Sequence, residues 1–533
     1  MQSFDEISKL IKSNPDCITN YISLGDYYLN EHNNVNQAYL CYEYAYNHSA
    51  QNDKNDILQK MNACMDSEDY SVNPFSFIIL SYNSMKIMQE CLNAIRNYCD
   101  LGTYETVIVD NASTDGIREW LLQQPDIKLI LNDKFDGFSA GCNQGAKAAS
   151  PSNDIFLLNN DAIISERSIL YLRLGLYTGS DIGIAGPVSC NVIPEQLNDS
   201  TARNKDDWFS IASKINQPLE PALQFSHWLQ GHAMLIKRKV WDEIGGLDTN
   251  CRFGGAEDLE YTIRANSMGY KTCICKNAFI YHYGSTSMKT KSSEYAIAIS
   301  NNHRYFEHKY GIPIGKVLES SHYVALNYIN APKEKPIRVL EINGGFSNTL
   351  NIIKYKYPNS EIHAIDSNPL IVHIASNYLH AICCDIEKTA FPFEFEHFDY
   401  IIAFGILNCI DDTFGFLKKL KKYLKHDGHL ILENPNANHI SVLDALVHGH
   451  LSCTDSAAAI ANVAKHYYTT DDMYQILIDC GYNCSGLTWT YSSNFATLTD
   501  SQQNTLDILM QLPDAKDKNT YLHTGAIFDA TPN

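Results

Sequence analysis

SFIILSYN (76–83), ETVIVDNAS (105–113), IKLILN (127–132) and DIFLLNND (154–161) are four short apolar runs that alternate with helical patterns. Such alternation predicts a parallel β-sheet whose strands are joined by crossover helices. Each run ends in polar residues, and in sheets of this kind ligands bind beyond the carboxyl ends of the strands. We therefore expect a functional site at that edge of the sheet.

A second alternating region begins at IRVLEINGG (337–345), after a stretch in which regular periodicity fades. The 533 residues exceed one typical domain, and at about 150 residues per domain they leave room for about three units. The predicted fold class is α/β multidomain with a small N-terminal all-α region. The predicted divisions are 1–70 (helical), 72–315 (first α/β domain), 316–336 (linker), 337–498 (second α/β domain) and 499–533 (C-terminal helix and tail).

The first 70 residues have the pattern of helices, opened by a capping box of Ser3 and Glu6. Aromatic and small residues then recur in a pattern that resembles a tetratricopeptide repeat: Tyr21, Leu24, Gly25, Tyr28, Ala38, Tyr42 and Ala45. Fewer than two repeats are visible, whereas about three make an independent solenoid. Two interpretations stay open, a helical cap docked on the next domain and a module that binds a protein partner.

The net charge of -20, from 41 basic and 61 acidic residues, argues against a nucleic-acid partner. The acidic start, MQSFDEISKL, lacks the basic and apolar regions of a secretion signal. No run approaches the ~18 apolar residues of a membrane span. The 16 cysteines are scattered and show no recurring CxxC pair, so we expect reduced thiols. The expected location is the cytoplasm, without an integral membrane segment.

The first α/β region contains a series of motifs in a fixed order. They are IILSYNS, VIVDNASTDG, NDKFDGFSAGCNQGAKAA, FLLNND, WLQGHAMLIKR, GGLD, GGAEDLEYTIRANSMGY and HYGSTS. In this order the region resembles glycosyltransferase family 2, especially its rhamnosyltransferase-like branch. The resemblance implies the GT-A nucleotide-sugar-binding fold and an inverting transfer from a nucleotide-diphosphate sugar donor.

The resemblance places Tyr82 and Asp110 beside the nucleotide base, the ring by stacking and the carboxylate by accepting an imide N–H. A carboxylate at this position could instead cap the next helix. Glycines in the third motif permit close backbone approach, although they also suit a flexible turn. The other expected nucleotide-sugar-binding residues are Ser81, Ser113, Asp115, Gly137, Asn143, Asn159 and Asn160.

Asn159, Asn160 and Asp161 stand where the family has its metal-binding DXD motif, with Asn in place of the first Asp. Asp161 is thus expected to bind a divalent cation, and His282 matches the histidine that completes the coordination in relatives. Mg²⁺ and Mn²⁺ both suit oxygen ligands, and a nitrogen ligand favours Mn²⁺ modestly. The alternative for His282 is a structural histidine at a strand end.

Two adjacent acids, Glu257 and Asp258, begin an amphipathic helical pattern. By resemblance Asp258 is the catalytic base that takes the proton of the acceptor hydroxyl, and Glu257 is its catalytic neighbour. Both acids could instead only favour the helix dipole. The family's acceptor-side segment corresponds to Trp228, Gly231 and His232.

The second α/β region, with RVLEINGGFSNTL, HAIDSNP and CCDIE, resembles the class I S-adenosylmethionine-dependent methyltransferases, which have a Rossmann-like fold. Asn343 and Ser347 replace two glycines of the usual motif, a change that could narrow the cofactor pocket. The residues that would bind S-adenosylmethionine are Glu341, Asn343, Gly344, Gly345, Asp366 and Asp385.

The sequence therefore predicts a metal-dependent glycosyltransferase whose acceptor is a glycan or protein hydroxyl, as in a cell-surface polysaccharide or a flagellin-type glycan. The second α/β domain could methylate the product. The alternative is a transferase whose helical and methyltransferase-like regions are non-catalytic scaffolds that recruit an acceptor protein.

Overall fold

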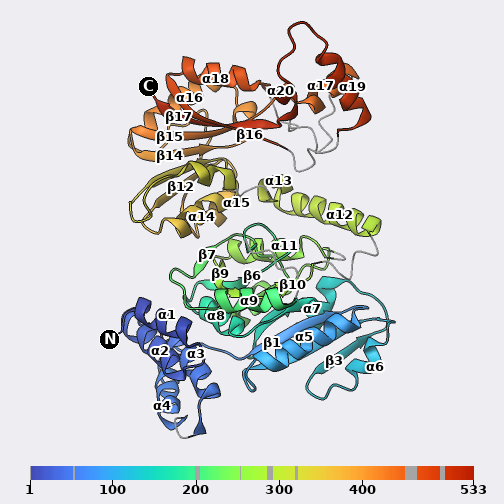
Figure 1. Ribbon diagram of the computed structural model, residues 1–533. Helices are drawn as coiled ribbons and strands as arrows, with labels where there is room; N and C mark the ends of the chain where they lie inside the picture. Colours follow the sequence, from blue (N-terminus) through green and yellow to red (C-terminus); the bar gives the residue numbers. More distant parts are fainter. Residues whose placement is uncertain are drawn as a thin grey trace. The chain divides into compact units, whose positions relative to one another are not determined.

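The computed structural model describes residues 2–51, 54–198, 205–251, 254–284, 292–318, 322–449, 465–491 and 498–533 (Figure 1). The chain divides into two compact units, Met1–Ile314 and Gly315–Asn533. Each unit contains one large β-sheet. The two predicted α/β regions therefore fold as separate sheets.

The first unit opens with the predicted helices. They are α1 (Phe4–Ser13), α2 (Ile18–His32), α3 (Val35–His48) and α4 (Lys54–Met65). The capping box of Ser3 and Glu6 is present at the start of α1. Gly25 of α2 faces the ring of Tyr42 of α3, and a Cβ at Gly25 would lie 2.5 Å from that ring. The small residue is thus what lets α2 and α3 approach each other.

These helices pack on α8 (Ser168–Leu176) of the α/β domain. The side-chain amide of Gln37 donates to the carbonyl of Leu174 and to the hydroxyl of Thr178, both at 3.0 Å. The guanidinium of Arg173, which is buried, forms an ion pair with Glu43. In this unit the N-terminal helices are therefore docked, as the cap interpretation expects.

The large sheet of the first unit has the strand order β3-β2-β1-β4-β8-β6-β9-β7. The four runs quoted first form its parallel half, with β1 between β2 and β4, and β3 outside β2. A second sheet pairs β10 with β5. The strands are β1 (Phe75–Ser81), β2 (Tyr104–Asn111), β3 (Lys128–Asn132), β4 (Asp154–Leu158), β5 (Ala162–Ile163), β6 (Ile182–Val188), β7 (Leu223–Phe225), β8 (Ala233–Ile236), β9 (Lys271–Phe279) and β10 (Tyr281–His282).

The remaining helices of this unit are α5 (Met85–Tyr98), α6 (Ile117–Leu121), α7 (Phe138–Ala148), α9 (Lys205–Ile215), α10 (Arg238–Ile244), α11 (Glu257–Ser267) and α12 (Ser292–Tyr310). Helix α7 lies close to β1 because two of its glycines leave room for strand side chains. A Cβ at Gly141 would lie 2.3 Å from Leu80, and one at Gly145 would lie 2.6 Å from Ile78. The close approach that these glycines permit is thus between helix and strand.

The second unit has the strand order β13-β12-β11-β14-β15-β17-β16. Its first five strands are parallel, and β17 is antiparallel to both of its neighbours. The strands are β11 (Arg338–Ile342), β12 (Glu361–Asp366), β13 (His380–Cys383), β14 (Phe398–Ala403), β15 (Leu424–Pro435), β16 (Tyr482–Thr490) and β17 (Gly525–Pro532). The helices are α13 (Ile314–Leu318), α14 (Asn348–Lys356), α15 (Pro369–Ala375), α16 (Thr413–Tyr423), α17 (Ile440–Val447), α18 (Thr470–Asp479), α19 (Asp500–Leu509) and α20 (Lys518–Leu522), with 3-10 turns at Tyr323–Tyr328 and Leu407–Cys409.

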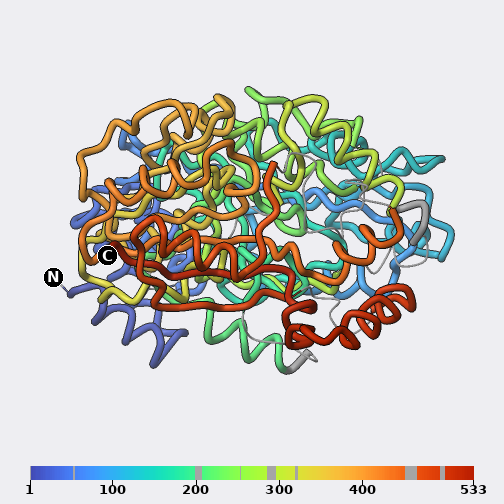
Figure 2. Tube along the Cα trace, turned by 90° about the horizontal axis from the view of Figure 1, so that it is seen from above, coloured from blue at the N-terminus to red at the C-terminus, as the bar shows by residue number. Residues whose placement is uncertain are grey.

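The end of the chain differs from the predicted tail. Strand β17, red in Figures 1 and 2, runs beside β15, so the sheet extends to Pro532 rather than ending near residue 498. Phe528 and Ile527 are buried on opposite faces of this strand. The short apolar stretch is recognisable as a strand only through the two neighbours that it pairs with.

The predicted linker, residues 316–336, also differs from expectation where it is described. It packs on the second unit, with Ala325 and Ile329 buried against the sheet. The hydroxyl of Tyr357 donates to the carbonyl of Ile329 at 2.8 Å. A 3-10 turn has no long apolar period, which explains why the sequence pattern fades here.

Fifteen cysteines lie in the described part of the chain, and all are free thiols. Among the same residues no helix combines the length and apolar character needed to span a membrane.

Candidate functional site

The predicted donor-binding residues follow the carboxyl ends of β1, β2 and β4. Ser81 and Asp110 are direct neighbours in the register of β1 and β2. Strand β4 ends at Leu158, immediately before Asn159. The polar ends of the strands thus meet at one edge of the sheet, where parallel sheets bind ligands.

Asp110 is fully buried at this edge. One carboxylate oxygen accepts from the backbone N–H of Ser113 at 3.1 Å and lies 3.3 Å from the guanidinium of Arg118. The other oxygen, Oδ1, is buried without a hydrogen-bond partner, as is the hydroxyl of Ser81. Buried polar atoms without partners are rare in folded proteins. Their presence here fits a ligand that donates a hydrogen bond.

The ring of Tyr82 lies edge to face with Phe135, with 4.9 Å between the ring centres. The loop after β1, which carries Tyr82, is tied to the loop after β2. Ser113 accepts from the N–H of Asn83, and Asp115 accepts from the N–H of Met85, both at 3.1 Å. These bonds fix the loop of Tyr82 relative to the end of β2.

Asp161 and His282 are both buried, with side chains 6% and 4% exposed, and Asp161 Oδ1 lies 3.2 Å from His282 Nε2. The other ring nitrogen, Nδ1, lies 3.1 Å from the carbonyl of Asn191 and donates to it. This contact directs the lone pair of Nε2 toward the carboxylate when the ring is neutral. A carbonyl that orients the ring in this way is usual for a metal-ligating histidine. The donor set of one carboxylate and one imidazole fits a divalent cation such as Mn²⁺.

His232 lies beside this pair, with its ring 5.1 Å from that of His282. Burial and the neighbouring His282 lower the pKa of His232 well below its usual range, so its ring is neutral. Both of its ring nitrogens are buried without a hydrogen-bond partner. The amide of Asn159 lies 3.5 Å from His282, and the Asn159 N–H donates to the His232 carbonyl. Asn160 is buried next to them.

Asp258 lies in the first turn of α11 and is mostly buried. Its carboxylate accepts from the backbone N–H of Gly231 at 2.8 Å and from that of Leu259 at 2.7 Å. Burial raises the pKa of Asp258, although these N–H groups act in the opposite direction. Trp228, which belongs to the same segment as Gly231, also acts to lower the pKa of Asp258.

Glu257, the neighbouring acid, is also buried, and its Oε2 has no hydrogen-bond partner. Burial and the charge of Asp258 raise the pKa of Glu257. The charge of one acid opposes ionisation of the other, so the pair holds a proton to a higher pH than an isolated carboxyl group does.

Asp161 and His282 lie near the segment that holds Asp258. Asp258 is bonded to Gly231, the next residue is His232, and the ring of His232 packs near that of His282. The Ser285–Ser287 part of the HYGSTS motif lies outside the described residues. Within the described part, the structure thus brings the proposed cation ligands and the proposed base together.

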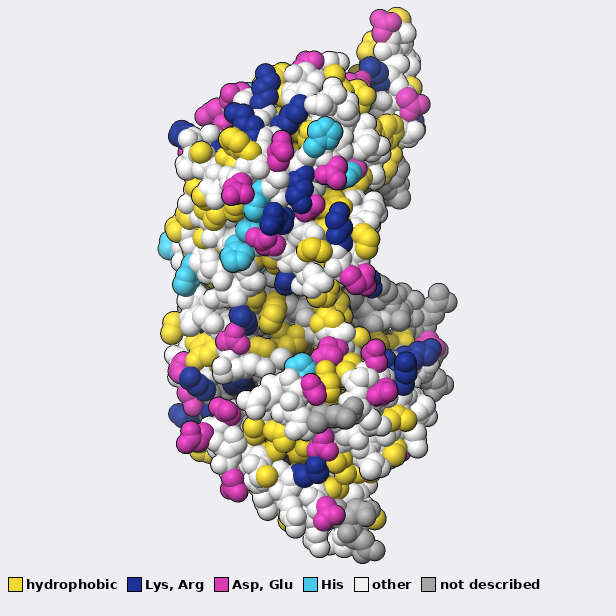
Figure 3. Space-filling model, turned by 90° about the vertical axis from the view of Figure 1, so that its left-hand side faces the viewer, with side chains coloured by type: hydrophobic (Ala, Val, Ile, Leu, Met, Phe, Trp, Pro, Cys, Tyr) yellow, Lys and Arg dark blue, Asp and Glu magenta, His cyan; other side chains and the backbone are white. Residues whose placement is uncertain are grey.

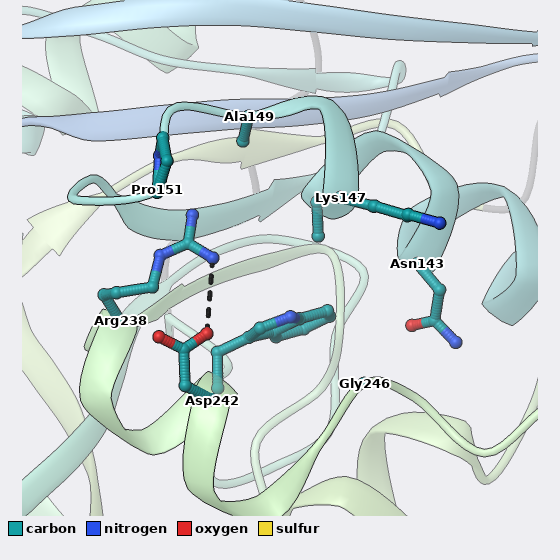
Figure 4. Close-up of a pocket in the computed structure, with 9 residues that line it drawn as sticks. Asn143, Lys147, Ala149, Pro151, Arg238, Asp242 and Gly246 are labelled. Atoms are coloured by element: carbon teal, nitrogen blue, oxygen red, sulfur yellow. Dashed lines mark ion pairs between the residues drawn. The ribbon is translucent and has the colours of Figure 1, made fainter.

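The Asn143 side chain, which was expected to bind the donor, contacts the protein backbone in this structure. It accepts from the N–H of Leu247 and donates to the Leu247 carbonyl, both at 2.8 Å. Asn143 therefore holds the loop of the GGLD motif, residues 245–248. Gly137, with φ 96°, is the residue immediately before α7. Asn143 also lines a hollow of about 430 Å³ between α7 and α10, where Arg238 pairs with Asp242 (Figure 4). Asp161, His282 and Asp258 do not line this hollow.

Three contacts of the site escaped prediction from the sequence. Phe135 lies inside a quoted motif, where an aromatic residue in a glycine-rich loop was a usable signal. Arg118 pairs with Asp110 from the following helix. Asn191 supplies a backbone carbonyl, which any residue could do, so no sequence signal exists for it.

The second unit has its own acidic pair at the carboxyl edge of its sheet. Glu341 and Asp366 are buried at the ends of β11 and β12, and each has one carboxylate oxygen without a hydrogen-bond partner. His322 Nδ1 lies 3.0 Å from Glu341, and the ammonium of Lys316 lies 3.5 Å from Asp366. Both side chains come from the segment predicted as a linker. The Asp366 oxygen that lacks a hydrogen bond, Oδ2, is the one that lies near Lys316. The free oxygen of Glu341, Oε2, fits a cofactor that donates a hydrogen bond.

The turn after β11 has a left-handed backbone at both substituted positions. Asn343, Gly345 and Ser347 have φ values of 57°, 60° and 55°. A Cβ at Gly344 would lie 2.3 Å from the Glu341 side chain, so this glycine is needed. Asp385 is exposed and accepts from the N–H groups of its own turn, which with Lys388 lower its pKa.

The family matches fall on the two α/β regions of the chain. Residues 76–241 match the family described as glycosyl transferase family 2, and residues 340–430 match a methyltransferase domain. The chain is 27% identical over 218 residues to the glycosyltransferase AglE of Haloferax volcanii, a match that spans 40% of this chain and 68% of AglE. It is 24% identical over 238 residues to the low-salt glycan biosynthesis hexosyltransferase Agl10 of the same organism, across 44% of this chain and 75% of Agl10.

A structure of a SAM-dependent methyltransferase from Archaeoglobus fulgidus is 15% identical, with a TM-score of 0.29, and the match covers 43% of this chain and 98% of that one. The two family matches and the two sheet topologies point to the same arrangement. The chain thus carries a glycosyltransferase family 2 domain of the GT-A fold, preceded by docked helices and followed by a Rossmann-like methyltransferase domain.

Proposed function

We propose that this protein is a metal-dependent, inverting glycosyltransferase that moves a sugar from a nucleotide-diphosphate donor to an acceptor hydroxyl. The observation that carries the proposal is the buried contact between Asp161 and His282 beside the segment that holds Asp258. The name of Agl10, a glycan biosynthesis hexosyltransferase, supports a glycan as acceptor. A protein hydroxyl, as in a flagellin-type glycan, is the other acceptor class of this proposal.

Each part of the site has a chemical task. Tyr82 and Phe135 offer aromatic surface to the base, and the free Oδ1 of Asp110 accepts the imide N–H of a uracil or thymine. Asp161 and His282 would hold a divalent cation, which would offset the charge on the departing diphosphate. Asn159 and Asn160 lie next to these ligands and complete the polar lining of the donor site.

Asp258 takes the proton of the acceptor hydroxyl as the hydroxyl oxygen forms its bond to the anomeric carbon. The bond from that carbon to the diphosphate breaks on the opposite side, so the anomeric configuration inverts. The N–H groups of Gly231 and Leu259 hold the carboxylate in place. Trp228, Gly231 and His232 form the acceptor side of this site, and the buried Glu257 supports α11 at its start.

A panel of nucleotide sugars tests this proposal. The purified chain is incubated with uridine-, thymidine- and guanosine-diphosphate sugars, with Mn²⁺ or with a chelator, and the released nucleotide diphosphate is measured. We expect release from a uridine or thymidine donor that requires the cation. Release that is unchanged by the chelator would contradict the cation site, and release from guanosine donors alone would contradict the base contact of Asp110.

For the second unit the proposed ligand is S-adenosylmethionine, held by Glu341, Gly345 and Asp366, and bound cofactor would supply a methyl group for the product. A second candidate function is a scaffold that recruits an acceptor protein, because Lys316 and His322 already pair with the two acids. Calorimetric titration with S-adenosylmethionine separates them. Saturable binding that Asp366→Asn weakens supports the cofactor domain, and no binding supports the scaffold.

A further inference from the structure

The methyltransferase domain contains a group of possible metal ligands that the proposed function does not use. One carboxylate oxygen of Glu361 and one ring nitrogen from each of His363 and His397 lie within 4.8 Å of one another. We refer to these three residues as the β12 cluster. Figure 3 shows several histidine side chains, in cyan, exposed on the face in view.

The sheet itself brings the cluster together. Glu361 and His363 are two residues apart on β12, so their side chains lie on the same face, and His363 Nε2 lies 3.0 Å from Glu361 Oε1. His397 comes from the turn just before β14. Since β11 lies between β12 and β14, the cluster connects two strands that do not pair with each other.

His363 is the unusual member of the cluster, because it is only 6% exposed and its Nδ1 has no hydrogen-bond partner. Phe393 and Phe398 pack edge to face against its ring. The nitrogen that faces Glu361 is Nε2, so Nε2 is the atom that a metal shared with this carboxylate would bind.

The other two ligands leave a path from solvent. The Glu361 side chain is 44% exposed, and Arg338 contacts its Oε2 at 3.0 Å, which leaves Oε1 on the side of His363. Two imidazoles and one carboxylate are a donor set that Zn²⁺ takes readily, with water as a fourth ligand. We infer that the β12 cluster is a binding site for Zn²⁺ at the amino-terminal edge of the methyltransferase sheet.

This site is separate from both sites described above. Glu361 begins β12 and Asp366 ends it, so at about 3.3 Å per residue the two lie roughly 17 Å apart along the strand. Ligand atoms around zinc lie about 3.3 Å apart, so binding needs the cluster to contract. The half-buried His397, in a turn, can make that movement. The bound ion would tie the start of β12 to the turn before β14.

The test uses the full chain with Asp161→Asn and His282→Gln, which removes the cation pair of the transferase domain. This metal-stripped background protein is titrated with Zn²⁺ against a chromophoric chelator. We expect one Zn²⁺ per chain and a higher melting temperature with Zn²⁺ present. Absence of binding in this background would overturn the inference.

Three further substitutions in the same background identify the ligands. His397→Gln and Glu361→Gln change side chains that are partly exposed, so the fold should persist, and each should weaken Zn²⁺ binding at least about tenfold. His426→Gln, at an exposed histidine of β15, is the matched control and should leave the affinity unchanged. Unchanged Zn²⁺ affinity in His397→Gln would also overturn the inference, and it would leave the proposed sugar transfer untouched.

Discussion

Asp161 Oδ1 lies 3.2 Å from His282 Nε2 in the interior of the transferase domain, and Nδ1 of the same ring contacts the carbonyl of Asn191. When the ring is neutral, with Nδ1 donating to that carbonyl, Nε2 turns a lone pair toward the carboxylate. A divalent cation near both atoms would satisfy them, as a proton on Nε2 would in an ion pair. The relationship is therefore the geometric basis of the proposed metal site.

Removal of either ligand should weaken the binding of the cation. We expect Asp161→Asn to raise the Mn²⁺ concentration needed for half-maximal nucleotide diphosphate release by roughly 10- to 100-fold, and His282→Gln to do the same. Mn²⁺ titration of the reaction rate measures this. Asp242→Asn, an exposed acid of the same domain, serves as the control and should leave the titration unchanged. An equal response of all three variants would contradict the assignment.

Asp110→Asn should weaken the binding of uridine diphosphate. A charge-assisted hydrogen bond contributes about 1.5–3 kcal/mol, so we expect a loss of roughly 10- to 100-fold in affinity. Calorimetry with uridine and cytidine diphosphates measures the change, because cytosine offers no imide N–H to this carboxylate. Equal losses for both nucleotides would show that Asp110 only supports Ser113 and Arg118.

The transfer rate should rise with pH along an acidic limb. Asp258 acts as a base only when it is ionised, and burial raises its pKa above the ordinary range of aspartate. Activity should therefore be low where Asp258 is protonated and increase as the pH rises through its raised pKa. A profile of kcat/KM against pH in saturating Mn²⁺ checks this. An acidic limb at or below the ordinary aspartate pKa would contradict the role of the buried carboxylate.

Gly25→Ala should destabilise the docked helices. The new methyl group would meet the ring of Tyr42, whose hydroxyl is fixed by a 2.6 Å hydrogen bond to Asp26. Overpacking costs about 1–3 kcal/mol, and the better helix propensity of Ala returns about 1 kcal/mol. Thermal unfolding should show a lower first transition. Thr19→Ala, at an exposed position of α2, should not lower it.

Much of the first site was predictable because its chemistry is local in sequence. Tyr82, Asp110 and Asp161 follow apolar runs, and the rule that ligands bind at the carboxyl ends of parallel strands places them at one edge. The role of Asn143 was not predictable in this way. An amide side chain suits a ribose, a phosphate or a backbone equally well, and only the folded chain brings Leu247 within its reach.

The second unit shows where patterns along the chain carry too little information. Lys316 and His322 reach the acids of the cofactor edge from a segment without regular period. Strand β17 is short and lies far along the chain from β15, the neighbour that it pairs with. The β12 cluster joins residues from two separate strands, and nothing in the spacing of Glu361, His363 and His397 indicates that they meet.

The most direct test of the account is the turnover of Asp258→Asn with a donor that the native chain accepts. We expect the rate of sugar transfer to fall roughly 100- to 10,000-fold. Donor affinity should stay nearly unchanged, because the Asn side chain keeps the hydrogen bond from Gly231 and the donor contacts lie on other strands. Measurement of kcat together with donor binding by calorimetry separates these effects. Native turnover in Asp258→Asn would contradict the proposed mechanism.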